Sequence, residues 1–463
     1  MKRALVFPFL IALGACTAGP DYVRPDIASD QSWRPQAEVR LSGDQPWWSG
    51  FRDPMLNHLE ARALGQSLTI EQALAKLDQA RAAAGNATAA RAPSFQAGGA
   101  AARSRQSLNS GMGQLIEYVP DLPRTVESFD LSGSASWDLD FAGGLRRRQE
   151  AATAGVMEAQ AGVEAARLAV STELAAAYFR LRVAQAQREA LVAVVASARG
   201  RTLISMARVS AGDLSVAESE RTSAAAEQAA SALPDTDARI EAEIARISVL
   251  VGQKIEVPLN GGTDFLYDAP DPLPEASPEV LRRRPDIAAA EARLIASNAL
   301  IGAALSEYWP RLSLGGILGV QSGGLSQLLT NESLTAQGSL GLRWRIFDFG
   351  RLDAEVAAAR GRNREMLAAY RETVLRAGTE IESGQAALVA ARETLSRLTA
   401  EYEARERLHA RLAAAVQAGG LDRDQLLLSQ IQLAETRLRL ADARGRQALA
   451  LIAIYRALGP AMT

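Results

Sequence analysis

The chain has 463 residues, with 51 Lys and Arg against 53 Asp and Glu, two His and a single Cys. This near balance of charge gives no global basic field, so we expect no nucleic-acid partner. The two histidines lie far apart, and the sequence contains no Cys/His cluster, nucleophile elbow or phosphate-binding loop. We therefore predict no enzyme, no metal site and no bound cofactor.

The N-terminus has the pattern of a lipoprotein signal. Lys2 and Arg3 precede about a dozen apolar residues, which is the length of a signal-peptide core and too short to span a membrane. Small residues lead to Cys16, and a lone thiol cannot form an internal disulfide. We expect residues 1–15 to be removed and Cys16 to carry a covalent lipid such as palmitate. The alternative is an ordinary signal peptide with an incidental cysteine.

No later stretch contains 18 or more uninterrupted apolar residues, so we expect no transmembrane helix. If the protein crosses a membrane, it must therefore do so with strands.

The chain also contains an internal repeat. Ile70 matches Ile287 at an offset of 217 residues, whereas Trp137 matches Trp344 at an offset of 207 that persists to the end. The difference implies a longer loop between Pro93 and Trp137 in the first copy. A fixed offset over more than a hundred residues indicates a tandem duplication. The predicted organisation is a lipidated N-terminal and equatorial segment (16–66), a first repeat (67–252), a linker (253–283) and a second repeat (284–463).

Each repeat contains one predicted β-hairpin, at about 94–141 and 311–349. In residues 128–141 the odd positions are apolar or small and the even positions are polar, and residues 339–346 repeat the alternation. This pattern is typical of strands between lipid and a wet lumen, although a soluble β-sandwich would show it too. Three aromatic residues near the strand ends are candidates for the membrane interface: Phe141, Trp344 and Phe349.

Four strands cannot close a barrel, and open edges are not tolerated in hydrocarbon. Two copies would give a barrel filled by side chains, whereas three copies would give twelve strands and a lumen. We therefore expect a homotrimer.

The rest of each repeat is a predicted helical hairpin, at about 145–252 and 352–459. Val374, Ile381 and Leu388 belong to a strict seven-residue repeat, which is typical of left-handed supercoiling with a partner helix. The first helix of each hairpin would extend on the order of 90 Å. Glycine-containing turns at 211–215 and 418–422 would return the chain. A solvent-exposed coiled coil or an α-solenoid would give similar heptads.

Two runs of three arginines flank these elements. We interpret residues 146–148 as lying below the strands near lipid headgroups, and residues 282–284 as preceding a helix that starts at Pro285.

Three segments resemble one known family: CTAGPDYVRP (16–25), WWSGFRDPMLNHLEARAL (47–64) and LRRRPDIAAAEARLIASNALIGAALSEYWPRLSL (281–314). They are similar to TolC-like outer-membrane efflux factors, in the NodT/OprM lipoprotein branch, over nearly the whole mature chain. RRRPDI and the following AE (290–291) and IG (301–302) are the most specific part.

The resemblance implies a membrane α+β fold, in which three duplicated protomers form a 12-stranded outer-membrane β-barrel and a periplasmic α-helical barrel. It implies the passive exit duct of a tripartite efflux pump in a Gram-negative bacterium, with a periplasmic adaptor (membrane fusion protein) and an inner-membrane RND-type transporter as partners. In this branch the lipid is attached to the residue that matches Cys16. A periplasmic adaptor or coiled-coil lipoprotein without a pore is the alternative.

The resemblance also implies an iris at the helix turns, matching residues 208–220 and 415–428. Leu428 stands where family members often have an acidic residue that helps to line the aperture. We hypothesise that Arg423 pairs with a neighbouring acid to hold the closed state. The aperture candidates are Asp213, Glu218, Glu220, Asp422, Arg423 and Asp424.

Overall fold

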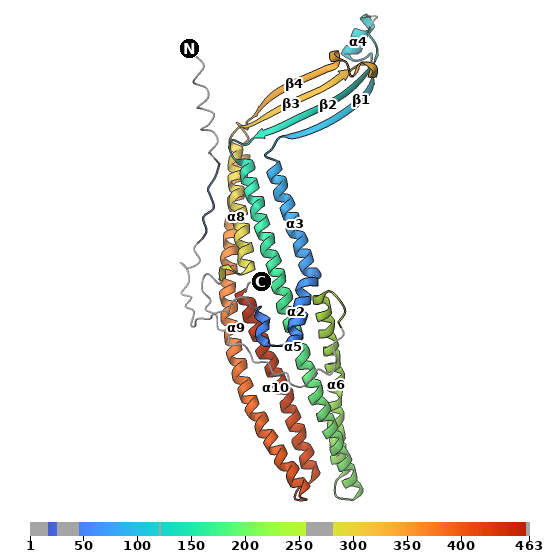
Figure 1. The fold of residues 1–463 in the computed structure, drawn as a ribbon, viewed down its shortest axis with the longest axis vertical. Coiled ribbons are helices and arrows are strands. Elements are labelled where there is room, and N and C mark those ends of the chain that lie inside the picture. Colours follow the sequence, from blue (N-terminus) through green and yellow to red (C-terminus); the bar gives the residue numbers. More distant parts are fainter. Residues whose placement is uncertain (1–16, 26–45, 120–121, 256–280, 460–463) are drawn as a thin grey trace. The chain divides into compact units, whose positions relative to one another are not determined.

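The computed structural model describes residues 17–25, 46–119, 122–255 and 281–459 (Figure 1). These residues fall into two compact units. Of the described residues, the first unit contains 17–25, 78–119, 122–158 and 291–369, and the second contains 46–77, 159–255, 281–290 and 370–459. The predicted signal peptide, Cys16 and most of the predicted linker lie outside the described residues.

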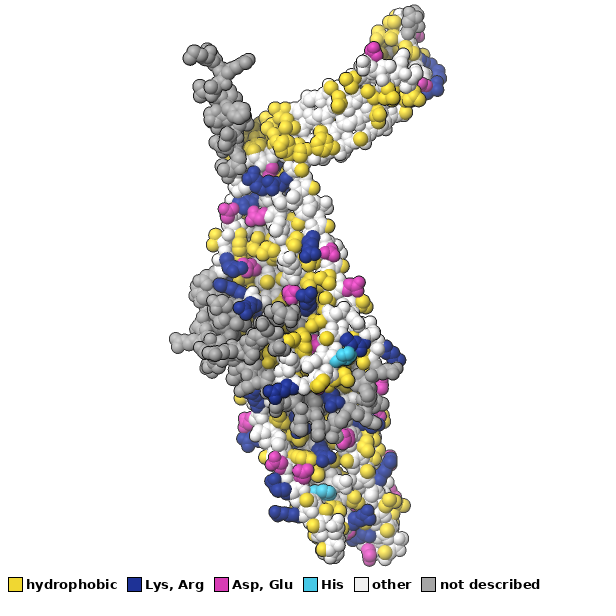
Figure 2. All heavy atoms as spheres, viewed as in Figure 1, with side chains coloured by type: hydrophobic (Ala, Val, Ile, Leu, Met, Phe, Trp, Pro, Cys, Tyr) yellow, Lys and Arg dark blue, Asp and Glu magenta, His cyan; other side chains and the backbone are white. Residues whose placement is uncertain are grey.

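The first unit contains one antiparallel sheet of four strands in the order β1 (Ser94–Arg105), β2 (Thr125–Leu139), β3 (Arg311–Ser322) and β4 (Leu334–Arg343) (Figure 1). Its register places Leu131 opposite Val320 and Leu314 opposite both Trp137 and Leu340. Directly opposed residues point to the same face, so the apolar rows of neighbouring strands coincide. The predicted alternation is confirmed, and in Figure 2 the middle of the sheet shows hydrophobic and uncharged side chains on the face in view.

The sheet differs from the expectation at two places. Helix α4 (Gly111–Tyr118), capped by the Ser110 hydroxyl, occupies the longer first connection that was expected to be a loop. Strand β4 ends at Arg343, so Trp344 and Ile346 lie beyond the strand to which their alternation assigned them. Beyond the strand, the Asp348 carboxylate accepts hydrogen bonds from the backbone amides of Gly350 and Leu352, where the next helix begins. Three short 3-10 turns, η3 (Ser306–Tyr308), η4 (Leu325–Gln327) and η5 (Asn331–Ser333), flank β3 and β4.

The long helices reproduce the duplication residue by residue. Helix α5 (Gly144–Ser210) and α9 (Arg351–Gln417) have 67 residues each, and α6 (Val216–Val251) and α10 (Arg423–Leu458) have 36 each. Both pairs are offset by 207 positions at each end. Helices α3 (Leu68–Ala89) and α8 (Pro285–Leu305) and strands β1 and β3 begin 217 positions apart. The tandem duplication is therefore confirmed in the structure.

Two tryptophan hydrogen bonds, one in each repeat, show both the 207-residue and the 217-residue offset. The Trp137 indole donates to the Arg91 carbonyl over 2.8 Å, and the Trp344 indole donates to the Tyr308 carbonyl over 3.1 Å. The two tryptophans are 207 positions apart and the two acceptors 217. Each repeat thus ties the end of its second strand to the segment that precedes its first.

The core of the second unit surrounds α2 (Pro54–Gln66) and the 3-10 turn η2 (Trp47–Phe51). The Phe51 and Phe179 ring centroids are 4.7 Å apart, and those of Trp47 and Tyr455 are 5.1 Å apart. Asp53 caps α2 through the amides of residues 55 and 56 and also accepts the Tyr178 hydroxyl over 2.6 Å. The sequence segment 47–64 therefore forms part of the core, with packed aromatic residues and one short helix.

The predicted heptad seam is buried in this unit. Val374, Ile381 and Leu388 are each less than 10% exposed, and Ala177 of the first repeat is fully buried. A methyl group on Gly384 would lie 3.0 Å from the Ile454 side chain, so the absence of a side chain lets α9 and α10 approach closely. The antiparallel coiled-coil hairpins are confirmed.

Helix α5 and the segment Pro285–Tyr308 each contain an 18-residue window of mean hydropathy 1.3, so by length and composition both could cross a membrane. The sequence contains no uninterrupted apolar run of that length, and the expectation of no transmembrane helix stays a prediction. Helix α5 and this segment are rich in alanine, and core helices of soluble proteins reach the same value, so the test is weak evidence for spanning.

Candidate aperture at the helix turns

The turns that join the long helices have the same backbone construction in both repeats. Gly212 and Gly419 have φ of +80° and +74°, a left-handed conformation that residues with a Cβ rarely adopt. The Asp213 amide donates to the Arg208 carbonyl, and its counterpart Gly420 donates to Ala415, each over 2.9 Å. These six-to-one bonds are Schellman closures, which explain why AG precedes both turns.

Polar side chains begin the returning helices. Ser215 caps α6 by accepting from the Glu218 amide, and Asp422, 207 positions later, caps α10 by accepting from the Asp424 amide. The second cap is a carboxylate, so the second turn gains a negative charge beside the positive end of the helix dipole.

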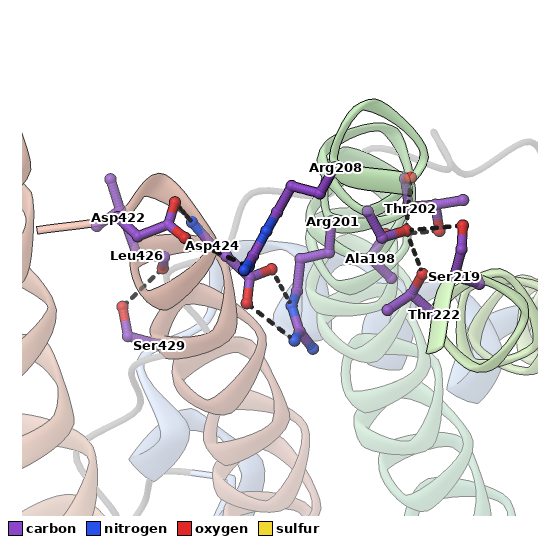
Figure 3. A network of polar contacts seen from close by, with 11 residues as sticks. Ala198, Arg201, Thr202, Arg208, Ser219, Thr222, Asp422, Asp424, Leu426 and Ser429 are labelled. Atoms are coloured by element: carbon purple, nitrogen blue, oxygen red, sulfur yellow. Dashed lines mark hydrogen bonds and ion pairs between the residues drawn. The ribbon is translucent and has the colours of Figure 1, made fainter. Parts of the chain in front are cut away.

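Two ion pairs join the hairpin of the first repeat to that of the second (Figure 3). The Arg201 guanidinium of α5 binds the Asp424 carboxylate with two contacts of 2.8 and 3.2 Å, and both side chains are less than 30% exposed. Arg208, one heptad further along α5, lies 3.8 Å from the Asp422 carboxylate and is about half exposed. The fork-to-fork geometry and partial burial make the first pair the stronger one.

Apolar and hydroxyl contacts surround the ion pairs. A methyl group on Gly200 would lie 3.1 Å from the Leu427 side chain, so α10 packs closely on α5 one residue before Arg201. The Ser205 hydroxyl lies 2.7 Å from Thr222 and 3.2 Å from Ser219, which ties α5 to its own partner α6. Figure 3 shows these two sets of contacts on different sides of α5. One side of α5 therefore holds its own hairpin together, and the other joins the two hairpins.

The structure brings together only part of the set predicted from the sequence. Asp422 and Asp424 bind arginines of α5, whereas Glu218 pairs within its own helix with Arg221 over 2.7 Å. Asp213 and Glu220 are exposed, and so is Leu428 at the position where the family often has an acid. Arg423 is exposed and makes no ion pair with the described residues of its own chain, so its hypothesised pairing requires an acid from another copy.

Sequence reasoning missed Arg201 and Arg208. Their spacing of seven residues was a usable signal, because residues one heptad apart share a helix face. The sequence did not indicate which of the many acids on other helices would face them.

At the ends of β2 and β4, the predicted interfacial aromatic residues lie beyond the last residue of the strand. Phe141 is half-buried, Trp344 is about half exposed, and Phe349 is 92% exposed. Phe349 has a φ of +57° and stacks edge-to-face on Phe347, with 4.8 Å between the ring centroids. The β4–α9 connection thus presents an apolar surface that includes Phe347, which sequence reasoning did not select.

Each run of three arginines contains one buried member. Arg284 precedes Pro285, the first residue of α8 as predicted, and binds Asp286, Glu380 and the Ala457 carbonyl over 2.6 to 2.8 Å. Burial lowers the Arg284 pKa, but these carboxylates raise it by more. Arg147 is 4% exposed. The Arg147 side chain is therefore buried within the protein, and the interpretation that residues 146–148 lie near lipid headgroups stays a prediction.

Comparison with known proteins places the chain in a family. The profile of the outer membrane efflux protein family matches residues 59–253 and 276–460, one segment for each repeat. The chain is 27% identical over 448 residues to Nodulation protein T of Rhizobium leguminosarum, covering 94% of this chain and 92% of that protein. It is 28% identical to outer membrane protein OprJ of Pseudomonas aeruginosa, covering 97% and 94% of the two chains.

Solved structures of outer-membrane channels share the fold of this chain. The outer-membrane channel OprN superposes with a TM-score of 0.79 at 27% identity, covering 96% of this chain and 99% of that one. The open state of the Neisseria gonorrhoeae MtrE outer membrane channel has the same fold, with a TM-score of 0.82 at 24% identity and coverage of 96% and 98%. With both repeats matched and the fold shared, the chain belongs to the outer membrane efflux protein family.

Proposed function

We propose that this outer-membrane efflux protein assembles as a trimer and serves as the exit duct of a tripartite pump. The observation that carries the proposal is the four-stranded sheet, whose apolar rows coincide on one face and whose edge strands β1 and β4 pair with no other described strand. Leu318, Leu340 and Leu342 on the apolar face are each more than 60% exposed. Such a face is stable in lipid, but open edges there are not.

Three copies satisfy both conditions. If β4 of each copy pairs with β1 of the next, twelve strands close into a barrel wide enough for a lumen. The opposite face of the sheet bears Asp130, Ser132 and Ser136, which are suitable for a wet interior. A pore-free adaptor with a single coiled-coil hairpin would have no use for this sheet.

The helical hairpins supply the periplasmic part. Each copy has two hairpins of equal length, so a trimer would present six turns in a ring. We propose that these turns receive a periplasmic adaptor, which connects the duct to an inner-membrane RND-type transporter. Cys16 would carry the lipid anchor, and Phe141, Trp344 and Phe349 would lie at the membrane interface.

Gating follows from the ion pairs at the turns. Arg201–Asp424 and Arg208–Asp422 join the two hairpins of one copy, so widening the ring by separating the hairpins must break them. Asp213, Glu218, Glu220 and Arg423 would line the same ring.

Planar-bilayer recording tests the pore. Purified wild-type protein should produce discrete conductance steps, and the double variant Arg201→Ala/Arg208→Ala should produce larger or longer openings. Heat-denatured protein is the control. If neither protein conducts, the duct is excluded and the adaptor interpretation returns.

A further inference from the structure

The segment that follows Cys16 lies in a site built by parts of the chain far from it in sequence. We call residues 17–24 the strap, and Arg147, Glu291, Asn298 and Gly302 the seat. Glu291 and Gly302 belong to the AE and IG pairs that were the most specific part of the family resemblance. All of these residues lie in the first compact unit. Nothing in the efflux duct described so far requires them.

Arg147 holds the beginning of the strap. Its guanidinium donates to the Ala18 and Gly19 carbonyls over 3.1 and 3.2 Å and to the Asp21 carboxylate over 2.7 Å. Within its own helix it also binds Glu150 over 2.8 Å. A side chain that is 4% exposed must have partners for its charge and donors, and the strap supplies three of the four acceptors. Removing the strap would leave a buried cation with one carboxylate.

Helix α8 holds the rest of the strap. The Asn298 amide donates to the Pro20 carbonyl over 3.0 Å. The Glu291 carboxylate, 11% exposed, accepts from the Tyr22 hydroxyl over 3.2 Å and from the Arg24 guanidinium over 2.5 Å. Asn298 and Glu291 lie about two turns apart on α8, so the strap follows the helix.

Two glycines let the strap lie against the helix backbone. Gly19 has a φ of +89°, and a methyl group there would lie 2.5 Å from the Gly302 Cα. A methyl group on Gly302 would lie 2.5 Å from the Ala18 carbonyl oxygen and 2.8 Å from the Arg147 side chain. The repeat-related residue Gly85 of α3 has no atom within 4 Å of such a methyl group. The close fit is therefore specific to the copy of the helix that meets the strap.

The first residues of the strap lie beside the segment that follows β2. The Ala18 amide donates to the Ala142 carbonyl over 3.0 Å, and a methyl group on Gly143 would lie 2.9 Å from the Thr17 Cα. Residues 142 and 143 directly follow the end of β2 at Leu139 and precede α5. The residue bonded to Cys16 is thus fixed at the point where the chain leaves the sheet.

We propose that the seat is a binding site for the segment after the lipidation cysteine, and that strap docking ties the lipid anchor to the exit of β2. Copies that are anchored by lipid and have the strap docked would hold their edge strands at the same depth in the membrane, which favours pairing of β4 with β1 of the next copy. The assembly role rests on the proposed lipidation and trimer, whereas docking itself does not.

Gly302→Ala tests the proposal because alanine is the better helix former, so α8 is not weakened while the strap is blocked. Gly85→Ala is the matched control at the repeat-related position. Glu291→Gln, at the other end of the strap, is a second test that leaves the glycine contacts intact. The full-length protein is extracted from membranes, and three quantities are measured: hydrogen exchange of residues 17–24, the lipid mass on the chain and the trimer fraction by native mass spectrometry.

For Gly302→Ala we expect exchange in the strap to be faster by at least about tenfold, the lipid mass to be unchanged and the trimer fraction to fall several-fold. Glu291→Gln should shift exchange and trimer fraction in the same direction by less, and Gly85→Ala should match wild type. Wild-type exchange in both seat variants would overturn the docking claim. Fast exchange with a wild-type trimer fraction would overturn the assembly role. A wild type without lipid or without trimers would instead contradict the proposed function, and docking would still be judged from the exchange.

Discussion

The ion pair between Arg201 and Asp424 gives the most direct prediction about gating. Arg201→Ala removes the guanidinium that makes two contacts, of 2.8 and 3.2 Å, with a carboxylate on the other hairpin. In the proposed gate, the arrangement with the two hairpins joined loses this link, while each hairpin keeps its own contacts, such as that of Ser205 with Thr222. We therefore expect a higher open probability without loss of the trimer.

The size of the effect follows from burial. Two unit charges about 4 Å apart interact by about 4 kcal/mol at an effective dielectric constant of about 20, and desolvation and side-chain entropy cancel most of this. With side chains 26% and 29% exposed, a net coupling of about 1 kcal/mol per pair remains. In a trimer that opens as a unit, three pairs give about 3 kcal/mol, or roughly a hundredfold change in the ratio of open to closed states.

Single-channel recording in planar bilayers measures that ratio. A cycle with Arg201→Ala, Asp424→Ala and the double variant isolates the coupling, because the double variant should open no more than either single one. Arg397→Ala is the matched control, since its partner Glu393 lies on the same helix and neither residue belongs to the proposed aperture. Open probability unchanged in Arg201→Ala, or strictly additive effects in the cycle, would refute the reasoning.

Three further predictions concern stability. Burial raises the pKa of the Glu60 carboxyl well above its usual range, so the free energy of unfolding falls by about 1.4 kcal/mol per pH unit as pH rises from the unfolded pKa, about 4.3, toward the folded one. Glu60→Gln should remove this loss and raise Tm at pH 8 relative to wild type, as thermal scans from pH 5 to 8 would show; an unchanged pH dependence would contradict it. Arg284→Met leaves the Ala457 carbonyl and two partly exposed carboxylates, Asp286 and Glu380, without their cation, so we expect a loss of about 1 kcal/mol in denaturant unfolding, whereas Arg282→Met, the control in the same run, should change little. Gly419→Ala forces a Cβ into φ of +74° and should cost about 1 kcal/mol, more than Gly420→Ala in the same assay.

Much of the fold could be predicted because local patterns determine it. The alternation around Leu131 and Trp137 selects one face of a strand, and a slip of one residue would turn every apolar side chain to the other face. The glycines at 212 and 419 mark positions that need a positive φ, so the helix ends could be located closely. The duplication supports each of these predictions a second time, because the same pattern recurs 207 residues later.

The contacts between distant segments could not be predicted in the same way. Arg201 and Asp424 are 223 positions apart, and long Ala-rich helices offer many registers that would pair an arginine with some acid. The contacts of Arg147 with the strap could not be predicted, because two of its four acceptors are backbone carbonyls, which leave no trace in the sequence. Helix α4 was missed because its eight residues give too short a periodic pattern.

The measurement that tests the central claim most directly is the mass of the particle extracted from membranes, by native mass spectrometry in mild detergent. The account predicts three copies of the chain, each with added lipid mass that Cys16→Ala abolishes. A monomer, stable in mild detergent and free of lipid, would leave the sheet edges open and would contradict the trimeric duct.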